Sequence, residues 1–217
     1  MRIVEIFYSI QGEGRLAGVP SVFVRTAGCG LRCKWCDSGY AHDPQAGDEM
    51  SIAQILEAAN KWQASRHVVI TGGEPFLQAE LAELTQAFKA AGWHITIETA
   101  GVEHREGVRC DLMSISPKLA NSGMAAAMKP EIIRELIAEY DYQLKFVIDH
   151  TDDVNEVEQL LSKLGEVDKT RVMLMPQARR KAEYVEKAEM VAELCMEHGF
   201  VFCSRLQVLL WGEDRGR

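Results

Sequence analysis

Hydrophobic positions along the chain follow two alternating spacings. The short apolar run 68–70 is typical of a buried strand, whereas Ile52, Ile55 and Ala59 recur at the spacing of an amphipathic helix. Ser51, just before that helix, is a residue type that caps helix N-termini. The alternation of strand and helix patterns continues along the chain and predicts an α/β fold with a parallel sheet, either open or curled towards a barrel.

These elements follow one another without a linker, so we expect one domain over residues 1–217. The predicted helices begin at Ser51, near Leu77, after Pro130, near Val154 and near Glu183. The predicted strands are Ile3–Tyr8, Ser21–Arg25, Val68–Ile70, Ile95–Glu98, Leu112–Ser116, Gln143–Ile148, Arg171–Leu174, Phe200–Cys203 and Leu206–Leu210.

Composition narrows the function classes. The chain has 217 residues, 47% of them hydrophobic, which is ordinary for a globular protein. Its formal net charge of −8 argues against direct, broad binding to nucleic acid, because phosphate neutralisation needs a basic surface. No apolar run approaches the roughly 20 residues of a membrane span, and the N-terminus lacks a secretory signal pattern. We therefore expect a cytoplasmic protein with no membrane partner.

Glycine-rich or polar segments follow four of the predicted strands. They are residues 29–36, Thr71-Gly72-Gly73-Glu74-Pro75, Ser116-Pro117-Lys118 and Met175-Pro176-Gln177. In parallel α/β folds, ligands bind at the carboxyl ends of the strands. We expect these four segments to meet on one face and to form an active site there.

Three of the six cysteines, Cys29, Cys33 and Cys36, are separated by three and then two residues. Thiolates are soft ligands for zinc or iron–sulfur clusters, and structural zinc and ferredoxin clusters normally have four protein ligands. Three thiolates on a four-iron cluster would leave one iron open to a small ligand. The alternatives are a zinc knuckle completed by His42 or Cys110, and a thioredoxin-like redox pair.

The cysteine spacing, with Trp35 before the last cysteine, resembles the cluster motif of the radical S-adenosylmethionine superfamily. Thr71-Gly72-Gly73-Glu74-Pro75 resembles the superfamily's Gly-Gly-Glu-Pro motif. The resemblance implies an abbreviated core in the form of a partial (β/α)6-type parallel barrel. It also implies a 4Fe-4S cluster on the three cysteines, which cleaves S-adenosylmethionine to a 5′-deoxyadenosyl radical.

The run 6–14 and Cys36-Asp37-Ser38 resemble a narrower family, the 7-carboxy-7-deazaguanine synthases, over nearly the whole chain. This resemblance implies a carbon–nitrogen lyase of queuosine precursor biosynthesis, a tRNA modification pathway. The family contracts the ring of 6-carboxy-5,6,7,8-tetrahydropterin to 7-carboxy-7-deazaguanine with loss of ammonia, and S-adenosylmethionine is regenerated.

Site residues carry over by position. The resemblance assigns substrate binding to Ile10, Gln11, Gly12, Arg25 and Thr71, and a Mg²⁺ ligand to Ser38, where the family usually has threonine. Glu13 and Glu98 are further candidates, since carboxylates accept hydrogen bonds from ring N–H groups. Residues matching the S-adenosylmethionine site are Trp35, Cys36, Asp37, Gly73, Ser116, Pro117, Lys118, Met175, Pro176, Gln177 and Ala178.

The implied partners are a small pterin substrate, an electron donor such as flavodoxin or ferredoxin, and a second copy in a homodimer. Two rival functions remain open at this point. One is an enzyme that installs a glycyl radical on a protein partner, for which the Gln11-Gly12-Glu13 segment would be unexpected. The other is a zinc- or cluster-stabilised binding module, which would need neither Gly72 nor Gly73.

Overall fold

The computed structural model describes residues 1–216, and its centre is one nine-stranded sheet. The strand order is β3-β1-β2-β4-β5-β6-β7-β8-β9. The strands are β1 (Arg2–Ile10), β2 (Pro20–Thr26), β3 (Asp48–Glu49), β4 (His67–Gly72), β5 (His94–Thr99), β6 (Leu112–Ile115), β7 (Tyr142–Ile148), β8 (Val172–Pro176) and β9 (Val201–Phe202). The helices are α1 (Ile52–Ala59), α2 (Leu81–Ala90), α3 (Pro130–Glu139), α4 (Asp153–Leu164), α5 (Lys181–His198) and α6 (Leu206–Trp211).

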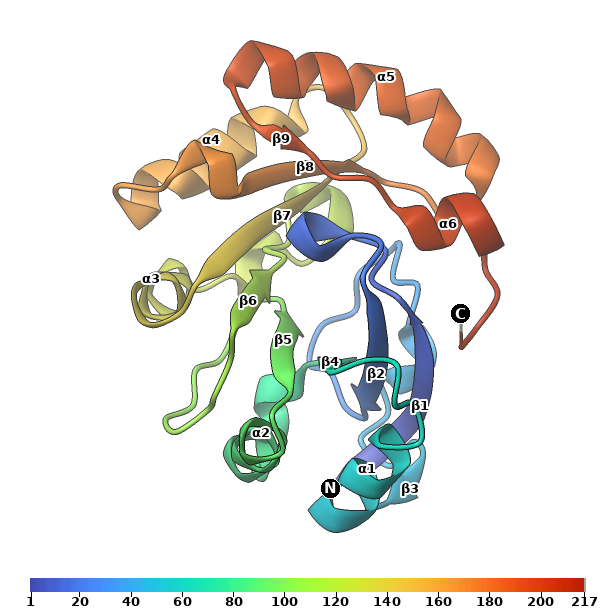
Figure 1. Cartoon of the computed structure of the whole chain (residues 1–217). Helices are drawn as coiled ribbons and strands as arrows, with labels where there is room; N and C mark the ends of the chain where they lie inside the picture. Colours follow the sequence, from blue (N-terminus) through green and yellow to red (C-terminus); the bar gives the residue numbers. More distant parts are fainter. Residues whose placement is uncertain (217) are drawn as a thin grey trace.

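Strands β2 and β4 to β9 pair in parallel, as the alternating pattern predicts. Figure 1 shows the sheet curving into an incomplete barrel, with α1 to α5 outside it. The interior and the carboxyl ends of the strands are left for ligands, while the helices cover the outer face. The fold expected from sequence, a partial parallel barrel, is therefore confirmed.

One strand departs from the parallel pattern. β1 pairs antiparallel with β2, with Phe7 opposite Phe23, and the two rings stack at a centroid distance of 4.9 Å. The connection between the strands contains only a short 3-10 turn, Gly14–Leu16. Parallel neighbours need a crossover of a dozen or more residues, so this short connection returns the chain antiparallel.

Two expected elements are wrong in detail. The helix expected near Leu77 begins at Leu81, and Leu77 itself lies in a 3-10 turn with 45% of its surface exposed. Leu206–Leu210 was expected to be a strand, but it forms α6. Val208 is buried against Tyr184 of α5. The apolar face of α6 is thus covered by a helix, and the segment needs no neighbouring strand.

Local signals explain the remaining helices. Ser51 and Gln54 form a reciprocal capping box at the start of α1, and Pro130 occupies the first turn of α3. α5 ends at Gly199 in the left-handed conformation, with φ of 72°. Cys195 on α5 is buried in the main core, as its apolar helical face predicts.

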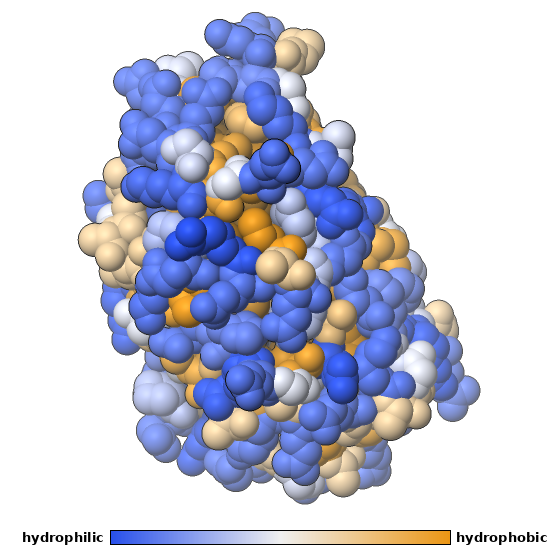
Figure 2. All heavy atoms as spheres, turned by 90° about the vertical axis from the view of Figure 1, so that its left-hand side faces the viewer, coloured by the Kyte–Doolittle hydropathy of each residue, from blue (hydrophilic) through white to orange (hydrophobic). Residues whose placement is uncertain are grey.

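The surface is largely polar. Figure 2 shows a predominantly hydrophilic face on which hydrophobic residues form scattered patches, in keeping with the acidic composition. Within residues 1–216, no helix has the length and apolar character needed to cross a bilayer.

A pair of histidines at the amino ends of β4 and β5 predicts pH-dependent stability. His67 and His94 are register partners whose ring centroids lie 4.7 Å apart. Burial lowers the pKa of His94; His67 and Lys89 lower it further, and Asp111 opposes them. Below about pH 6.5 the unfolded chain therefore binds a proton that the folded chain resists, and stability is lost as the pH falls through the folded pKa.

We expect urea unfolding to show this loss between neutral pH and about pH 5.5. The variant His94→Asn should lose less stability over that interval than the wild type. His150→Asn is the matched control, because the His150 side chain is 77% exposed. Equal losses in the wild type and His94→Asn would contradict the assignment.

Candidate active site

The three clustered cysteines lie on the loop that follows β2 and line one cavity of about 180 Å³. All three are free thiols and half-buried. Turn contacts shape the loop: the Cys36 amide donates to the Cys33 carbonyl at 3.2 Å, and the Leu31 amide approaches Cys29 Sγ at 3.4 Å. Burial raises the pKa of Cys29 and of Cys33, so a bound cationic group would be needed to hold them as thiolates.

The donor set fits a 4Fe-4S cluster better than a zinc ion. Within residues 1–216, no three His, Cys, Asp or Glu side chains gather closely enough to bind one metal ion. Cys110 lies elsewhere, packed against the core with its thiol donating to the Ile95 carbonyl at 3.6 Å. A cluster binds each thiolate on a different iron, so its ligands need not converge on one point. His42 lines the same cavity but forms no such group with the cysteines.

Gly73 brings the segment after β4 against the cysteine loop. A Cβ atom at Gly73 would lie 2.0 Å from the Gly28 carbonyl oxygen and 2.9 Å from Cys29 Cβ, so no larger residue fits without moving the loop. The next residue, Glu74, is buried and accepts hydrogen bonds from Thr99 Oγ1 at 2.7 Å and the Ala100 amide at 2.9 Å. Glu74 thus fastens this segment to the end of β5.

Gly73→Ala is therefore expected to destabilise the protein by about 1–3 kcal/mol and to prevent incorporation of most of the cluster iron. Gly30→Ala is the control on the same loop, because a Cβ there meets nothing within 4 Å. Iron and sulfide content after anaerobic reconstitution measures both variants. Normal iron content in Gly73→Ala would show that the close approach to Gly28 does not hold the loop.

The other residues expected to bind S-adenosylmethionine are only partly brought together. Lys118 Nζ donates to Ser116 Oγ at 3.0 Å and lies 5.5 Å from the centre of the Trp35 ring. The 180 Å³ cavity is lined by Trp35, Cys36, Asp37, Gly73, Ser116, Lys118 and Met175 among others. Ala178 instead lines a second cavity, and the lining of both cavities omits Pro117, Pro176 and Gln177.

The second cavity, of about 450 Å³, contains the residues expected to bind substrate: Ile10, Gln11, Gly12, Arg25 and Thr71. Arg25 Nε donates to Glu5 at 2.6 Å, and its guanidinium lies 5.9 Å from the centre of the Phe7 ring and 5.7 Å from that of Tyr40. The side chain is thus held in place at the cavity wall. Residues 212–216 also line this cavity, and the Arg215 guanidinium lies 4.0 Å from the centre of the Tyr40 ring.

A largely buried charge network lies where the two cavities meet. Lys145 Nζ, only 2% exposed, donates to Glu13 Oε2 and to Glu98 Oε2, both at 2.9 Å. Burial opposes ionisation of Glu13, but the charges of Lys145 and Arg205 outweigh it and hold the pKa of Glu13 well below its usual range. Glu13 and Glu98, candidates from sequence, are thus brought together, whereas Lys145 was missed.

Arg205 was also missed, and it connects three segments. Its Nε donates to Glu13 at 3.0 Å and its Nη2 to Asp37 Oδ2 at 2.8 Å, while Nη1 donates to the Ala178 carbonyl. Gln207 Nε2 donates to the same Glu13 oxygen at 2.7 Å. The signal in the sequence was a lone arginine between two predicted strands, Phe200–Cys203 and Leu206–Leu210, which is too common to single out.

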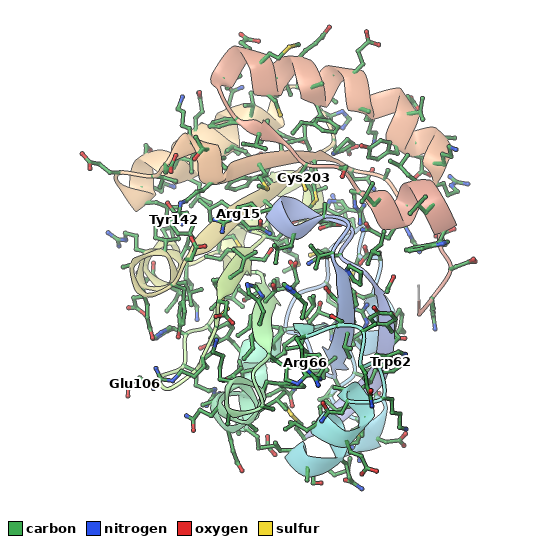
Figure 3. The ribbon with its side chains drawn as sticks, viewed as in Figure 1. Arg15, Trp62, Arg66, Glu106, Tyr142 and Cys203 are labelled. Atoms are coloured by element: carbon green, nitrogen blue, oxygen red, sulfur yellow. The ribbon has the colours of Figure 1, made fainter. Side chains whose placement is uncertain are left out.

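The two cavities share a wall, so ligands in them would lie side by side. Both are lined by Glu13, Asp37, Ser38, Thr71, Glu98 and Arg205. Ser38, expected to bind Mg²⁺, has its hydroxyl 3.8 Å from Cys36 Sγ. Figure 3 places Cys203 next to the turn after β1, where the Gly14 amide lies 3.1 Å from its sulfur. A partial parallel barrel with three half-buried cysteines over such a cavity defines a radical S-adenosylmethionine enzyme.

Comparison with known proteins supports this class and narrows it. The Radical SAM superfamily model matches residues 23–114. A 7-carboxy-7-deazaguanine synthase of Halobacterium salinarum is 40% identical over 97% of this chain and 90% of its own length. The enzyme of the same name from Pyrobaculum aerophilum is 39% identical over 100% and 97% of the two chains. The chain belongs to the 7-carboxy-7-deazaguanine synthase family.

Solved structures agree. The crystal structure of QueE from Escherichia coli matches with a TM-score of 0.73 and 25% identity, over 93% of this chain and 92% of that one. Streptococcus suis SuiB shares the fold, with a TM-score of 0.59 and 12% identity.

Proposed function

We propose that this chain converts 6-carboxy-5,6,7,8-tetrahydropterin to 7-carboxy-7-deazaguanine with loss of ammonia, as a carbon–nitrogen lyase of queuosine precursor biosynthesis. The observation that carries the proposal is the shared wall between the cysteine cavity and the cavity that holds Gln11, Arg25 and Glu13. A radical enzyme must hold cofactor and substrate side by side, and this arrangement allows direct hydrogen transfer between them.

The polar groups of the larger cavity suit a carboxylated pterin. The Arg25 guanidinium is apt for a carboxylate, and Glu13 accepts N–H groups of a guanidine-like ring edge. The Gln207 side chain also lines this cavity, and its Nε2 donates to Glu13 at 2.7 Å, which orients that carboxylate. The stacked Phe7 and Phe23 rings give the cavity an apolar wall.

The cluster and S-adenosylmethionine, when bound, supply the radical that activates the substrate. The chain's own residues bind, orient and exclude water. Lys118 and Ser116 offer donors to a methionine carboxylate, and Gly73 lets its segment pack closely against the cysteine loop at the same cavity. Lys145 and Arg205 hold Glu13 ionised, so that it binds substrate as an acceptor.

The test is anaerobic reconstitution with iron and sulfide, reduction with dithionite, and assay of carboxytetrahydropterin with S-adenosylmethionine and Mg²⁺. We expect deazaguanine product without stoichiometric loss of S-adenosylmethionine. Formation of 5′-deoxyadenosine alone would keep the radical chemistry and overturn the substrate. A glycyl-radical activating enzyme would give that result with the pterin and would modify a protein partner instead.

Mg²⁺ binding at Ser38 predicts a specific loss. Ser38→Ala removes the hard oxygen, so Mg²⁺ stimulation of turnover should largely disappear, whereas Ser38→Thr should retain it. Turnover is measured against Mg²⁺ concentration, and iron content serves as the control for the neighbouring Cys36. Equal Mg²⁺ stimulation in Ser38→Ala and the wild type would assign the ion to other oxygens.

We further propose that residues 1–217 act as one domain, in a homodimer, in the cytoplasm. The single continuous sheet supports the first of these statements. Three free cysteines that must stay reduced suit a reducing compartment. Light scattering of the reconstituted protein tests the dimer, and a monomeric mass would reject it.

A further inference from the structure

Arg25, on the wall of the larger cavity, has only one of its three guanidinium nitrogens occupied. Its Nε donates to Glu5 Oε1 at 2.6 Å, and within residues 1–216 this is the only hydrogen bond and the only ion pair of the guanidinium. Nη1 and Nη2 therefore remain available to a bound ligand. A pair of parallel N–H groups of this kind matches the two oxygens of a carboxylate.

The strand pairing places Glu5 behind this contact. Glu5 on β1 and Arg25 on β2 are register partners in the antiparallel pair, so their side chains lie on the same face of the sheet. Arg25, Phe7 and Tyr40 line the larger cavity, whereas the lining of both cavities omits Glu5. Glu5 thus acts on a ligand in the cavity through Arg25.

Tyr40 holds the same carboxylate from a different segment. Its hydroxyl donates to Glu5 Oε1 at 2.8 Å, and this oxygen also accepts from Arg25. The Arg25 guanidinium lies 5.7 Å from the centre of the Tyr40 ring and 5.9 Å from that of the Phe7 ring. These contacts restrict a long side chain before a ligand arrives, which lowers the entropic cost of binding.

Glu5 also has an electrostatic cost. A carboxylate beside Arg25 weakens the attraction of its cation for a bound anion, so charge alone would favour a site without Glu5. The other acid at this wall, Asp37, is ion-paired with Arg205 at 2.8 Å, and Arg215 adds a further cation to the lining. The orientation of Arg25 is the contribution to binding that remains for Glu5.

We propose that Glu5 and Tyr40 are positioning residues, which hold Arg25 with Nη1 and Nη2 towards the substrate carboxylate and thereby make the site prefer a carboxylate over a neutral amide. The inference rests on the proposed function, because it takes the carboxylated pterin and deazaguanine as the ligands of the larger cavity. A carboxylate accepts from both nitrogens, whereas an amide has one oxygen to accept and turns an NH₂ donor towards the other nitrogen.

Ligand preference tests this role. The reconstituted protein, with S-adenosylmethionine and Mg²⁺ but without reductant, is titrated calorimetrically with 7-carboxy-7-deazaguanine and with the corresponding 7-carboxamide. In Glu5→Leu the preference for the carboxylate should fall about tenfold, the effect of one lost charge-assisted hydrogen bond. Glu5→Gln keeps an acceptor for Arg25 Nε and should retain most of the preference. Tyr40→Phe keeps the ring but loses the hydroxyl, so its preference should fall about threefold.

Two further variants show whether the effect passes through Arg25. In the Arg25→Met background, adding Glu5→Leu should change the preference no further, because the group that Glu5 positions is gone. The matched control is Glu49→Leu, since Glu49 pairs with Arg2 at 3.5 Å and the lining of both cavities omits it. This control should prefer the carboxylate as strongly as the wild type does.

The outcomes separate this inference from the proposed function. An undiminished preference in Glu5→Leu and Tyr40→Phe would overturn the positioning role. Tighter carboxylate binding in Glu5→Leu would overturn it as well, because that is the result of a charge effect alone. If Glu5→Leu does not fold, Tyr40→Phe decides. A wild type that binds the carboxamide as tightly as the carboxylate would instead contradict the proposed substrate.

Discussion

Replacing Lys145 with methionine is expected to destabilise the protein by about 3–5 kcal/mol and to abolish turnover. The Lys145 ammonium is almost fully buried between Glu13 and Glu98, and methionine fills a similar volume without the charge. The half-buried carboxylates of Glu13 and Glu98 then face each other with only Arg205 to compensate, through its 3.0 Å contact with Glu13. Removing one partner of a buried ion pair destabilises a protein by more than the intact pair stabilises it, because the other charge is left buried without a partner.

The pH dependence identifies the cause of this loss. In the wild type the pKa of Glu13 is depressed, so its contribution to stability is present at neutral pH and is lost as acid protonates it. In Lys145→Met the carboxylate accepts a proton more readily. The stability gap between variant and wild type, measured by urea unfolding, should therefore narrow from pH 7.5 towards about pH 4.5.

Two further variants complete the experiment. Lys145→Met combined with Glu98→Gln should regain part of the lost stability, because one of the facing charges is gone. Lys61→Met is the control, since Lys61 is exposed. A gap that stays constant across pH would point to lost packing instead of unpaired charge.

The sequence predicts the local parts of this molecule well. The cysteine loop, the Gly-Gly-Glu-Pro segment and Ser116-Pro117-Lys118 each lie within a few residues at a strand end. Because parallel strands direct their carboxyl ends to one edge, strand order was not needed to expect that these segments meet. The 180 Å³ cavity brings all three together.

Contacts between distant segments could not be found in this way. Lys145 and Arg205 reach Glu13 across 132 and 192 residues of sequence, and only the curvature of the sheet brings β7 and the segment after β9 to that turn. A lysine in the middle of an otherwise buried strand was the available clue. All seven residues of β7 are buried, and Lys145 is tolerated there because its partners lie inside the barrel.

The wrong prediction of a strand at Leu206–Leu210 has the same cause. The composition of this apolar run is typical of a strand, and only its contacts with α5 and with the Gly12 carbonyl make it helical. The Leu206 amide donates to that carbonyl at 2.9 Å, which fixes the start of α6 beside the substrate cavity. Tertiary contacts thus override the local preference of this short segment for a strand.

Arg205→Met should lower product formation about 100-fold while 5′-deoxyadenosine formation falls much less. Arg205 does not carry out chemistry in this view; it positions the wall that both cavities share. Its three contacts hold Glu13 and Asp37, which line both cavities, and the Ala178 carbonyl beside the larger one. Without them, radical formation continues but the substrate is misaligned, so the ratio of 5′-deoxyadenosine to product rises.

This ratio separates positioning from general destabilisation, because unfolded protein would lose both products equally. Arg205→Lys keeps the charge but cannot span three acceptors with a planar fork, so its ratio should lie between those of the wild type and Arg205→Met. Arg66→Met is the matched control: Arg66 lies far from Cys203 in Figure 3, and its guanidinium is 5.2 Å from the centre of the Trp93 ring. If Arg205→Met gave the wild-type ratio of 5′-deoxyadenosine to product, the shared wall would align the ligands without Arg205. The role of Arg205 would then be stability alone.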